Sequence, residues 1–383
     1  MNPRMDSLPP LAGHKELRRR LADAVRRGRV PPALLLYGPP GVGKERLALW
    51  LAQQLLCDAP AEEPCGACWA CRQVPRLQHP DVHWYFPLSR PEASGDRLEA
   101  RLEEARANEL ERFRRQPYYV PVHDRPVAHY LAAMQMLRRR ATQPPARGRW
   151  TIVVLGDAEF LAPQEATTEA ANALLKLLEE PPAHTRLVLT ARHPEALLPT
   201  IRSRLVAVRV PPWPEAEVER FLREAVGWPP DRARAGAARS GGAPGIALRL
   251  AAADEPISHG QLRGQARAWL AAAVLEESVP RWAAALAMPP GMNRDSLAVA
   301  FDAFLVWVRD LLVLRLDPTA PLLDPEAREA WLDLLRRRPL PPLAWARAAE
   351  IIAEARRQLT RNVYPPLLVA VTLDALHRAL RAS

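Results

Sequence analysis

A glycine-rich segment between two apolar segments constrains this 383-residue chain more than any other feature. Residues 33–37, ALLLY, form a short apolar run typical of a buried strand, and residues 44–56 follow with the pattern of an amphipathic helix. The segment that joins them consists of Gly38, Pro39, Pro40, Gly41, Val42, Gly43 and Lys44. Strand, loop and helix in this order predict a phosphate-binding loop, in which backbone N–H groups, the helix N-terminus and the lysine face the phosphates.

The residue after Lys44 departs from the hydrolytic form of this motif. A Ser or Thr hydroxyl is expected there to bind Mg²⁺, whereas this chain has Glu45. A second motif is also altered, because Gly156 stands where a metal-organising Asp is expected and Asp157 stands where an activating Glu is expected. We therefore expect the loop to hold ATP or ADP without hydrolysis. The alternative is an ATPase in which Glu45 and Asp157 together hold Mg²⁺.

All four cysteines of the chain lie close together, with two-residue spacings between the last three; they are Cys57, Cys65, Cys68 and Cys71. Four thiolates in this pattern can bind one tetrahedral Zn²⁺. A disulfide pair and a redox-active CxxC are competing interpretations. Because the N-terminal residues lack the apolar stretch of a secretory signal, we expect a cytoplasmic protein with reduced thiols and a structural zinc centre.

Short apolar runs and proline clusters divide the chain. Runs at 151–155, 186–190 and 205–210 alternate with helical patterns and predict a parallel sheet covered on both faces. A charged pattern within 90–116 indicates a solvated surface helix or an insertion. Helices alone are expected from residue 253 on. The predicted domains are an α/β domain at 1–212 with a zinc insert at 57–71, a helical lid at 213–252 and an all-helical domain at 253–383.

The charge balance favours work near a polyanion. The chain carries 53 Lys+Arg against 43 Asp+Glu, a net charge of +10, although only three of the basic residues are lysines, which indicates compositional bias. The basic run at 138–140 leaves open a general DNA-binding ATPase as a weaker possibility. No apolar run approaches the length of a membrane-spanning helix.

Several motifs, in this order along the chain, resemble the AAA+ clamp loaders of bacterial DNA polymerase III. They are the phosphate-binding loop, the four-cysteine insert, His79-Pro80-Asp81, NALLKLLEEPP at 172–182 and LLPTIRSRL at 197–205. The resemblance implies an α/β AAA+ P-loop domain with a parallel sheet, a small helical lid and a C-terminal all-helical collar domain. It also implies a cytoplasmic hetero-oligomeric ring with motor (gamma/tau) and delta subunits, which loads the sliding clamp onto primed DNA in replication.

The same resemblance separates two types of subunit. Motor subunits carry a sensor-2 arginine in the lid, and in GGAPGIAL at 241–248 its place is taken by Gly245. Ser203-Arg204 instead matches a motif whose arginine, an arginine finger, reaches the ATP of an adjacent subunit, although Arg204 alone could be an ordinary surface arginine. Thr190 resembles sensor 1. The resemblance thus implies a delta-prime type of subunit within the polymerase III holoenzyme, not itself an ATPase and acting through Arg204 in trans; the alternative is the gamma/tau motor type.

Overall fold

The computed structural model describes residues 7–381 except 94, 122–126, 162–168, 253–258, 275–277, 289–293, 325–326 and 360–363. The described residues form two compact units, and the chain passes from the first to the second between Leu248 and Arg249. The predicted lid therefore lies in the same unit as the α/β part of the chain for almost its whole length. The finer boundaries at 212 and 252 stay predictions.

A five-stranded parallel sheet forms the centre of the first unit, which confirms the predicted α/β class. Its strands, in spatial order, are β2 (Val82–Tyr85), β5 (Thr151–Leu155), β6 (Thr185–Ala191), β1 (Ala33–Tyr37) and β7 (Val206–Arg209). Successive residues of a strand point to opposite faces of the sheet. Leu34 and Leu36 accordingly pack into one apolar core, while Leu35 packs into another on the other face.

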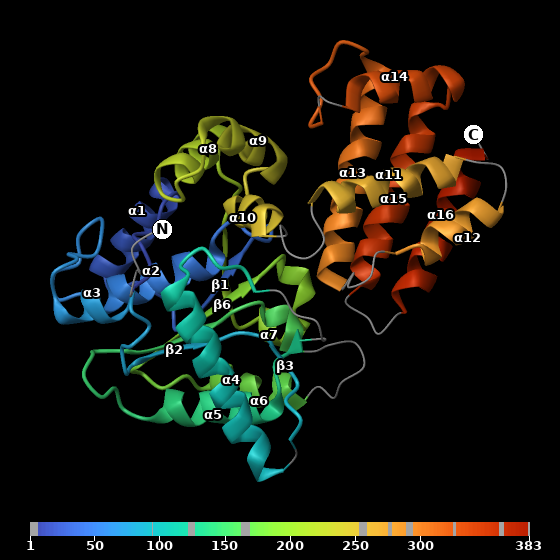
Figure 1. The fold of residues 1–383 in the computed structure, drawn as a ribbon. Coiled ribbons are helices and arrows are strands. Elements are labelled where there is room, and N and C mark those ends of the chain that lie inside the picture. The colour runs from blue at the N-terminus through green and yellow to red at the C-terminus, as the bar shows by residue number, and fades with distance from the viewer. Residues whose placement is uncertain are drawn as a thin grey trace. The chain divides into compact units, whose positions relative to one another are not determined.

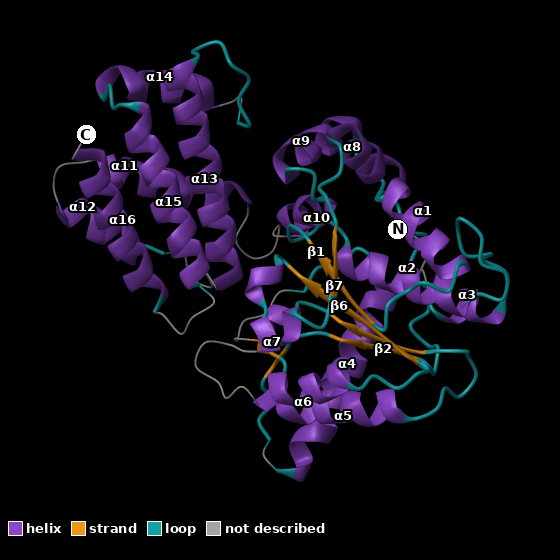
Figure 2. Ribbon diagram, turned by 180° about the vertical axis from the view of Figure 1, so that it is seen from behind, coloured by secondary structure: helices purple, strands orange, loops and turns teal. Residues whose placement is uncertain are grey.

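Helices cover both faces of this sheet (Figure 1). The Leu34 side is covered by α1 (Lys15–Arg26), α2 (Lys44–Leu56) and α3 (Trp69–Gln73), and the Leu35 side by α5 (Leu131–Thr142) and α6 (Glu169–Glu179). Figure 2 shows the strands between these two layers. Smaller elements are the antiparallel pair β3 (Leu88–Ser89) and β4 (Val127–Ala128), the 3₁₀ turns η1 (Ala158–Leu161) and η2 (Pro194–Ala196), and α7 (Pro199–Arg202).

The charged helix within 90–116 is more integrated than a solvated surface helix. It forms α4 (Asp96–Arg115), and its Leu102 is 1% exposed in the Leu35 core, whereas Phe113 packs against the opposite core. Arg106 donates a hydrogen bond to the carbonyl oxygen of Trp84 on edge strand β2 (3.2 Å). The thin apolar stripe is thus a packing face, and α4 covers an otherwise open sheet edge.

The lid consists of α8 (Glu215–Glu224), α9 (Pro230–Ser240) and α10 (Pro244–Ala252) around a small apolar core of its own. Trp213, Val218 and Leu222 are buried in this core together with alanines of α9 and α10. The small side chains of α9 allow it to pack closely on α8.

All described elements of the second unit after α10 are helices, as predicted. They are α11 (His259–Val274), α12 (Ser278–Leu286), α13 (Arg294–Leu316), α14 (Arg328–Arg337), α15 (Pro342–Gln358) and α16 (Pro365–Arg381). Their core is built around large aromatic side chains, among them Trp269, Phe301, Phe304 and Trp345. Within the described part of the chain, every helix is too short or too polar to cross a membrane.

Candidate phosphate-binding loop and metal centre

The glycine-rich loop lies where the sequence predicts it, between the end of β1 and the start of α2. Gly41 (φ 77°) and Gly43 (φ 98°) adopt the left-handed conformation, which costs other residues energy and explains the glycines. Lys44 is 2% exposed, and its Nζ donates a hydrogen bond to the carbonyl oxygen of Pro39 (3.1 Å). The ammonium group is therefore held within the loop, at the N-terminus of α2.

Glu45 is fixed by a hydrogen-bonded chain that connects three motifs. Thr190 donates from Oγ1 to Glu45 Oε1 (2.8 Å) and accepts from the backbone N–H of Asp157 (2.9 Å). Burial, the charge of Glu45 and the charge of Glu159 raise the pKa of Asp157. The Glu45 carboxylate thus occupies the place of a magnesium-binding hydroxyl. Together with Glu159 it disfavours a negative charge on Asp157.

Two glycines occupy positions where catalytic side chains were expected. A Cβ at Gly156 would lie 3.5 Å from Trp84 Nε1 and 3.6 Å from Glu45 Cγ, so a carboxylate there would face Glu45. Gly245 donates its N–H to the carbonyl oxygen of Gly41 (2.8 Å). A Cβ at Gly245 would lie only 2.8 Å from Gly41 Cα and 2.9 Å from its oxygen. The close contact of α10 with the loop therefore excludes any side chain at position 245, including an arginine.

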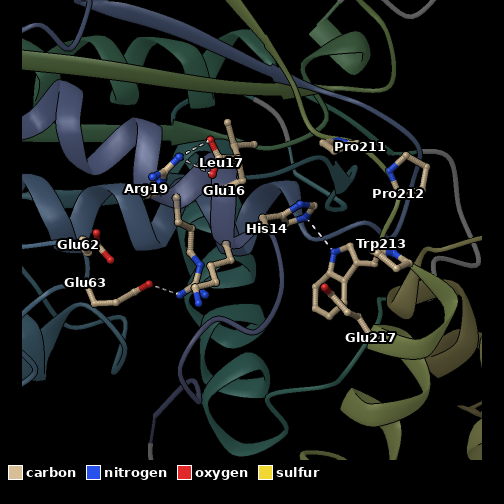
Figure 3. A pocket seen from close by; sticks show the side chains of 13 residues that line it. His14, Glu16, Leu17, Arg19, Glu62, Glu63, Pro211, Pro212, Trp213 and Glu217 are labelled. Carbon is tan, nitrogen blue, oxygen red and sulfur yellow. Dashed lines mark hydrogen bonds and ion pairs between the residues drawn. The ribbon is translucent and has the colours of Figure 1, made fainter.

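A second contact between lid and loop involves His14 and Trp213, which the sequence did not single out and which meet in Figure 3. The carbonyl oxygen of Val42 accepts a hydrogen bond from the Trp213 indole N–H (3.1 Å) and lies 2.8 Å from His14 Nε2. The two rings meet edge to face, with 2.9 Å between Trp213 Nε1 and His14 Nε2. Burial lowers the pKa of His14, which keeps the imidazole neutral. Trp213 also packs on Gly13, where a Cβ would lie 2.3 Å from the indole.

His14 and Trp213 line a cavity of about 660 Å³ that is also lined by Glu62 and Glu63 of the cysteine segment. Arg18 and Glu63 form an ion pair across it (2.6 Å), and Lys15, Glu16 and Glu217 add further charges of both signs. The mixed charges give the cavity no clear preference for an anion or a cation.

The four cysteines converge as the spacing predicts. Cys57 ends α2, Cys68 is the N-cap of α3 and Cys71 lies in α3, and the four Sγ atoms lie within 4.8 Å of one another. Backbone N–H groups point at three of the sulfurs, at 3.3–3.4 Å. Zn–S bonds of about 2.3 Å give a tetrahedron with S···S edges of about 3.8 Å, and Cys65 and Cys71 are 3.9 Å apart at Sγ. All four thiols are free of disulfide bonds, and the donor set fits one metal ion.

Arg204 lies on the surface after α7 and just before edge strand β7. Its guanidinium pairs with Glu179 Oε1 of α6 (2.8 Å) and donates to the carbonyl oxygen of Thr200 (2.8 Å). Within the described residues, its hydrogen-bond partners all belong to α6 and α7 and their flanks rather than to the phosphate-binding loop. Val206, two residues further on, is 52% exposed.

The basic run at 138–140 is partly paired within the chain. Arg139 pairs with Glu99, and Arg140 pairs with Glu103 (2.7 Å). Two of the three arginines of this run are therefore engaged within the chain.

Comparisons with known proteins agree on one family. The family model described as DNA polymerase III, delta subunit matches residues 13–214. DNA polymerase III subunit delta' of Pseudomonas aeruginosa is 32% identical over 282 residues, which cover 73% of this chain and 71% of that protein. The delta' subunit of Escherichia coli is 31% identical over 61% of this chain and 59% of its own length. The gamma/tau subunit of Mycobacterium bovis is 29% identical over 52% of this chain and 27% of its own.

Proposed function

Because the chain belongs to the delta-prime family of DNA polymerase III clamp-loader subunits, we propose that it assists loading of the sliding clamp without hydrolysing ATP itself. In this proposal the chain joins gamma/tau motor subunits and a delta subunit in a cytoplasmic ring that acts on primed DNA. Arg204 is the arginine finger that it presents to ATP in the adjacent motor subunit. Zinc, held by the four cysteines in reduced form, is the structural metal.

The observation that carries the proposal is the contact between Gly245 and Gly41. With α10 against the loop at 2.8 Å, the chain has no space for an arginine that could reach a γ-phosphate from its own lid. Glu45 adds a carboxylate where Mg²⁺ needs a hydroxyl, and Gly156 supplies no ligand. A nucleotide bound at residues 38–45 would lack both a well-held metal and a sensor-2 arginine, and would stay unhydrolysed.

Arg204 suits a role in trans for two physical reasons. Its ion pair with Glu179 lies at the surface, where such pairs contribute about 0–1 kcal/mol, so the guanidinium can leave it at little cost. The exposed Val206 on the adjacent edge strand offers an apolar surface to a neighbouring subunit. A planar guanidinium then stabilises the charge on the transferred phosphoryl group.

The purified chain alone is expected to show no ATPase activity above background, with or without primed DNA. Glu45→Thr is expected to leave it inactive, because Gly156 still provides no carboxylate for the metal. Phosphate release assays on the unmodified chain and on Lys44→Ala provide the measurement. Hydrolysis by the unmodified chain that Lys44→Ala abolishes would favour the motor alternative, in which Glu45 and Asp157 hold Mg²⁺.

Arg204→Ala is expected to lower the DNA-stimulated ATPase rate of the reconstituted clamp loader while folding, zinc content and assembly stay unchanged. An arginine finger raises the rate at one site by a factor of about 10³–10⁵. The rate of the whole complex should therefore fall by the fraction of hydrolysis that this one site contributes. Arg202→Ala is the matched control, since Arg202 is an exposed arginine at the end of α7, two residues before Arg204.

Two further variants sharpen this test. Arg204→Lys is expected to restore the rate only in part, since an ammonium cannot reproduce the planar fork. Lys44→Ala is expected to leave the rate of the complex almost unchanged. A complex with Arg204→Ala that assembles normally and both hydrolyses ATP and loads clamps at the unmodified rate would show that the arginine-finger assignment is wrong.

A further inference from the structure

Arginine side chains lie on two tryptophan rings near the start of β5. One ring, Trp69, belongs to the cysteine segment, and the other, Trp150, directly precedes β5. Arg147 places its Cζ 4.2 Å from the ring centre of Trp69 in α3. Trp150 is contacted by two arginines, with Arg186 Cζ at 3.8 Å and Arg149 Cζ at 5.4 Å from its ring centre. Three guanidinium groups are therefore supported on two indole rings from different parts of the chain.

The loop that carries Arg147 and Arg149 is held in place by a buried carboxylate. Asp81, 3% exposed, accepts hydrogen bonds from the backbone N–H groups of Ala146 (2.5 Å), Arg147 (3.0 Å) and Gly148 (2.6 Å). The neighbouring His79 packs edge to face on Trp69, with ring centres 4.9 Å apart. The His79-Pro80-Asp81 motif thus fixes both the loop and the indole on which Arg147 lies.

The positive charge of this surface is not compensated within the described part of the chain. Arg147, Arg149 and Arg186 form no ion pair there, unlike Arg139 and Arg140 on α5. Burial and the charge of Arg149 lower the pKa of Arg186, whose Nε is buried without a hydrogen-bond partner. The carboxylate of Asp81, beneath this loop, is engaged by the three backbone N–H groups. Like charges are therefore gathered where the fold supplies no counter-charge.

We propose that Arg147, Arg149 and Arg186 form a surface that binds the phosphodiester backbone of DNA. Guanidinium groups donate paired hydrogen bonds that match phosphate oxygens, and stacking on an indole holds the planar group at reduced entropic cost. An alternation of arginine with aromatic rings is typical of surfaces that track a nucleic-acid strand. The chain has a net charge of +10 and belongs to a DNA replication family, which favours DNA over an acidic protein as the polyanion.

This surface is independent of Arg204 and of nucleotide, so it is tested on the isolated full chain. Fluorescence anisotropy with a labelled single-stranded oligonucleotide and with a duplex of equal length, each over a range of NaCl concentrations, gives affinity and salt dependence. Arg147→Gln combined with Arg149→Gln is expected to weaken binding at least about tenfold. The slope of log K against log salt should fall by about 1.4 on the single strand, because each phosphate contact contributes about 0.7.

The lid provides a matched control. Arg232 stacks on Trp228, with Cζ 4.7 Å from the ring centre, and Arg239 is an exposed arginine on the same helix. Arg232→Gln with Arg239→Gln changes the net charge by the same amount and also removes one stack. We expect it to leave the DNA affinity and the salt slope close to those of the unmodified chain.

Replacement of Arg147 and Arg149 by Lys is expected to restore the salt slope, since lysine keeps the charge, while the affinity stays below that of the arginines. Metal content and unfolding temperature verify that each variant is folded. If the double Gln variant is not stably folded, the single Gln variants carry the test, with an expected fall in slope of about 0.7 each. The form of DNA, single strand or duplex, that loses more affinity in the double Gln variant is the form that this surface binds.

Two results would overturn the proposal. One is DNA binding by the double Gln variant with the affinity and the salt slope of the unmodified chain. The other is that the same variant loses binding of a labelled polyglutamate peptide while its DNA binding is unchanged, which would identify an acidic protein as the partner.

Discussion

Removal of the metal by a chelator is expected to unfold residues 57–80 while the parallel sheet stays folded. Between Asp58 and Cys68 the structure has no buried residue, and α3 has only five residues, too few to be stable alone. The remaining support consists of contacts such as the hydrogen bond from Trp50 Nε1 to Glu63 (2.8 Å) and the packing of Ala70 and Val74 in the Leu34 core. Structural zinc supplies about 10–16 kcal/mol in small zinc domains, so its loss should outweigh these contacts.

Hydrogen exchange with peptide resolution measures this effect. Amides in 57–80 should exchange rapidly after chelation and regain protection when zinc is added back, whereas amides of β1 and β5 should stay protected. Glu63→Gln is the control for the local hydrogen bond and should retain one equivalent of zinc. Freshly purified chain with well under one equivalent of metal, or protection that survives chelation, would contradict the assignment.

Asp81→Ala is expected to lower the free energy of unfolding of the first unit by about 3–5 kcal/mol. The substitution leaves three backbone N–H groups without the charged acceptor, and hydrogen bonds to charged groups are worth about 1.5–3 kcal/mol each. Because residues 146 and 147 are exposed, water replaces part of the lost bonds, and the net effect is smaller than their sum. Asp81→Asn keeps one acceptor oxygen, so its free energy of unfolding should lie between those of the unmodified chain and of Asp81→Ala. Urea unfolding at neutral pH measures the differences. Asp317→Ala is the control, because Asp317 also accepts a backbone N–H, from Thr319, but at an exposed site.

The effect of Asp81 should depend on pH with a defined sign. Burial alone would raise the pKa of Asp81, but the three backbone N–H groups outweigh burial and hold it below the ordinary value of 3.8. The carboxylate therefore contributes its full stabilisation above this value and loses it as the pH falls through the lowered pKa. The difference between the unmodified chain and Asp81→Ala should be constant at neutral pH and shrink in acid. A pH-independent difference would contradict this assignment.

The parts of the fold that were predicted from sequence are those with a local signal. β1 and β5 are continuous apolar runs, and the phosphate-binding loop and the cysteines are short motifs whose residues are neighbours in the chain. β2 was missed because VHWY is short and mixes polar with apolar residues, so that only its pairing with β5 defines it. The sequence did not predict that α4 is packed against the sheet. Leu102 is a single leucine in a charged segment, and its burial becomes evident only when the sheet edge beside it is known.

The parts of the site that were missed depend on long-range contacts. Trp213 and His14 are 199 residues apart, and the Gly245 N–H that meets Gly41 comes from the lid. The sequence showed that an arginine was absent at 245, but not that the backbone leaves no space for one. Asp81 likewise belonged to a recognised motif, while its partners at 146–148 carry no pattern of their own.

The contact between Gly41 and Gly245 also limits which single substitutions could give this chain a motor-type site. An arginine at 245 would push the lid away from the loop, and an aspartate at 156 would place a second carboxylate beside Glu45. Each substitution taken alone therefore lowers stability and gives no working catalytic site. Selection that acts on one substitution at a time removes such intermediates. In the non-motor role that we propose, a motor-type site would therefore arise only if several of these positions changed together.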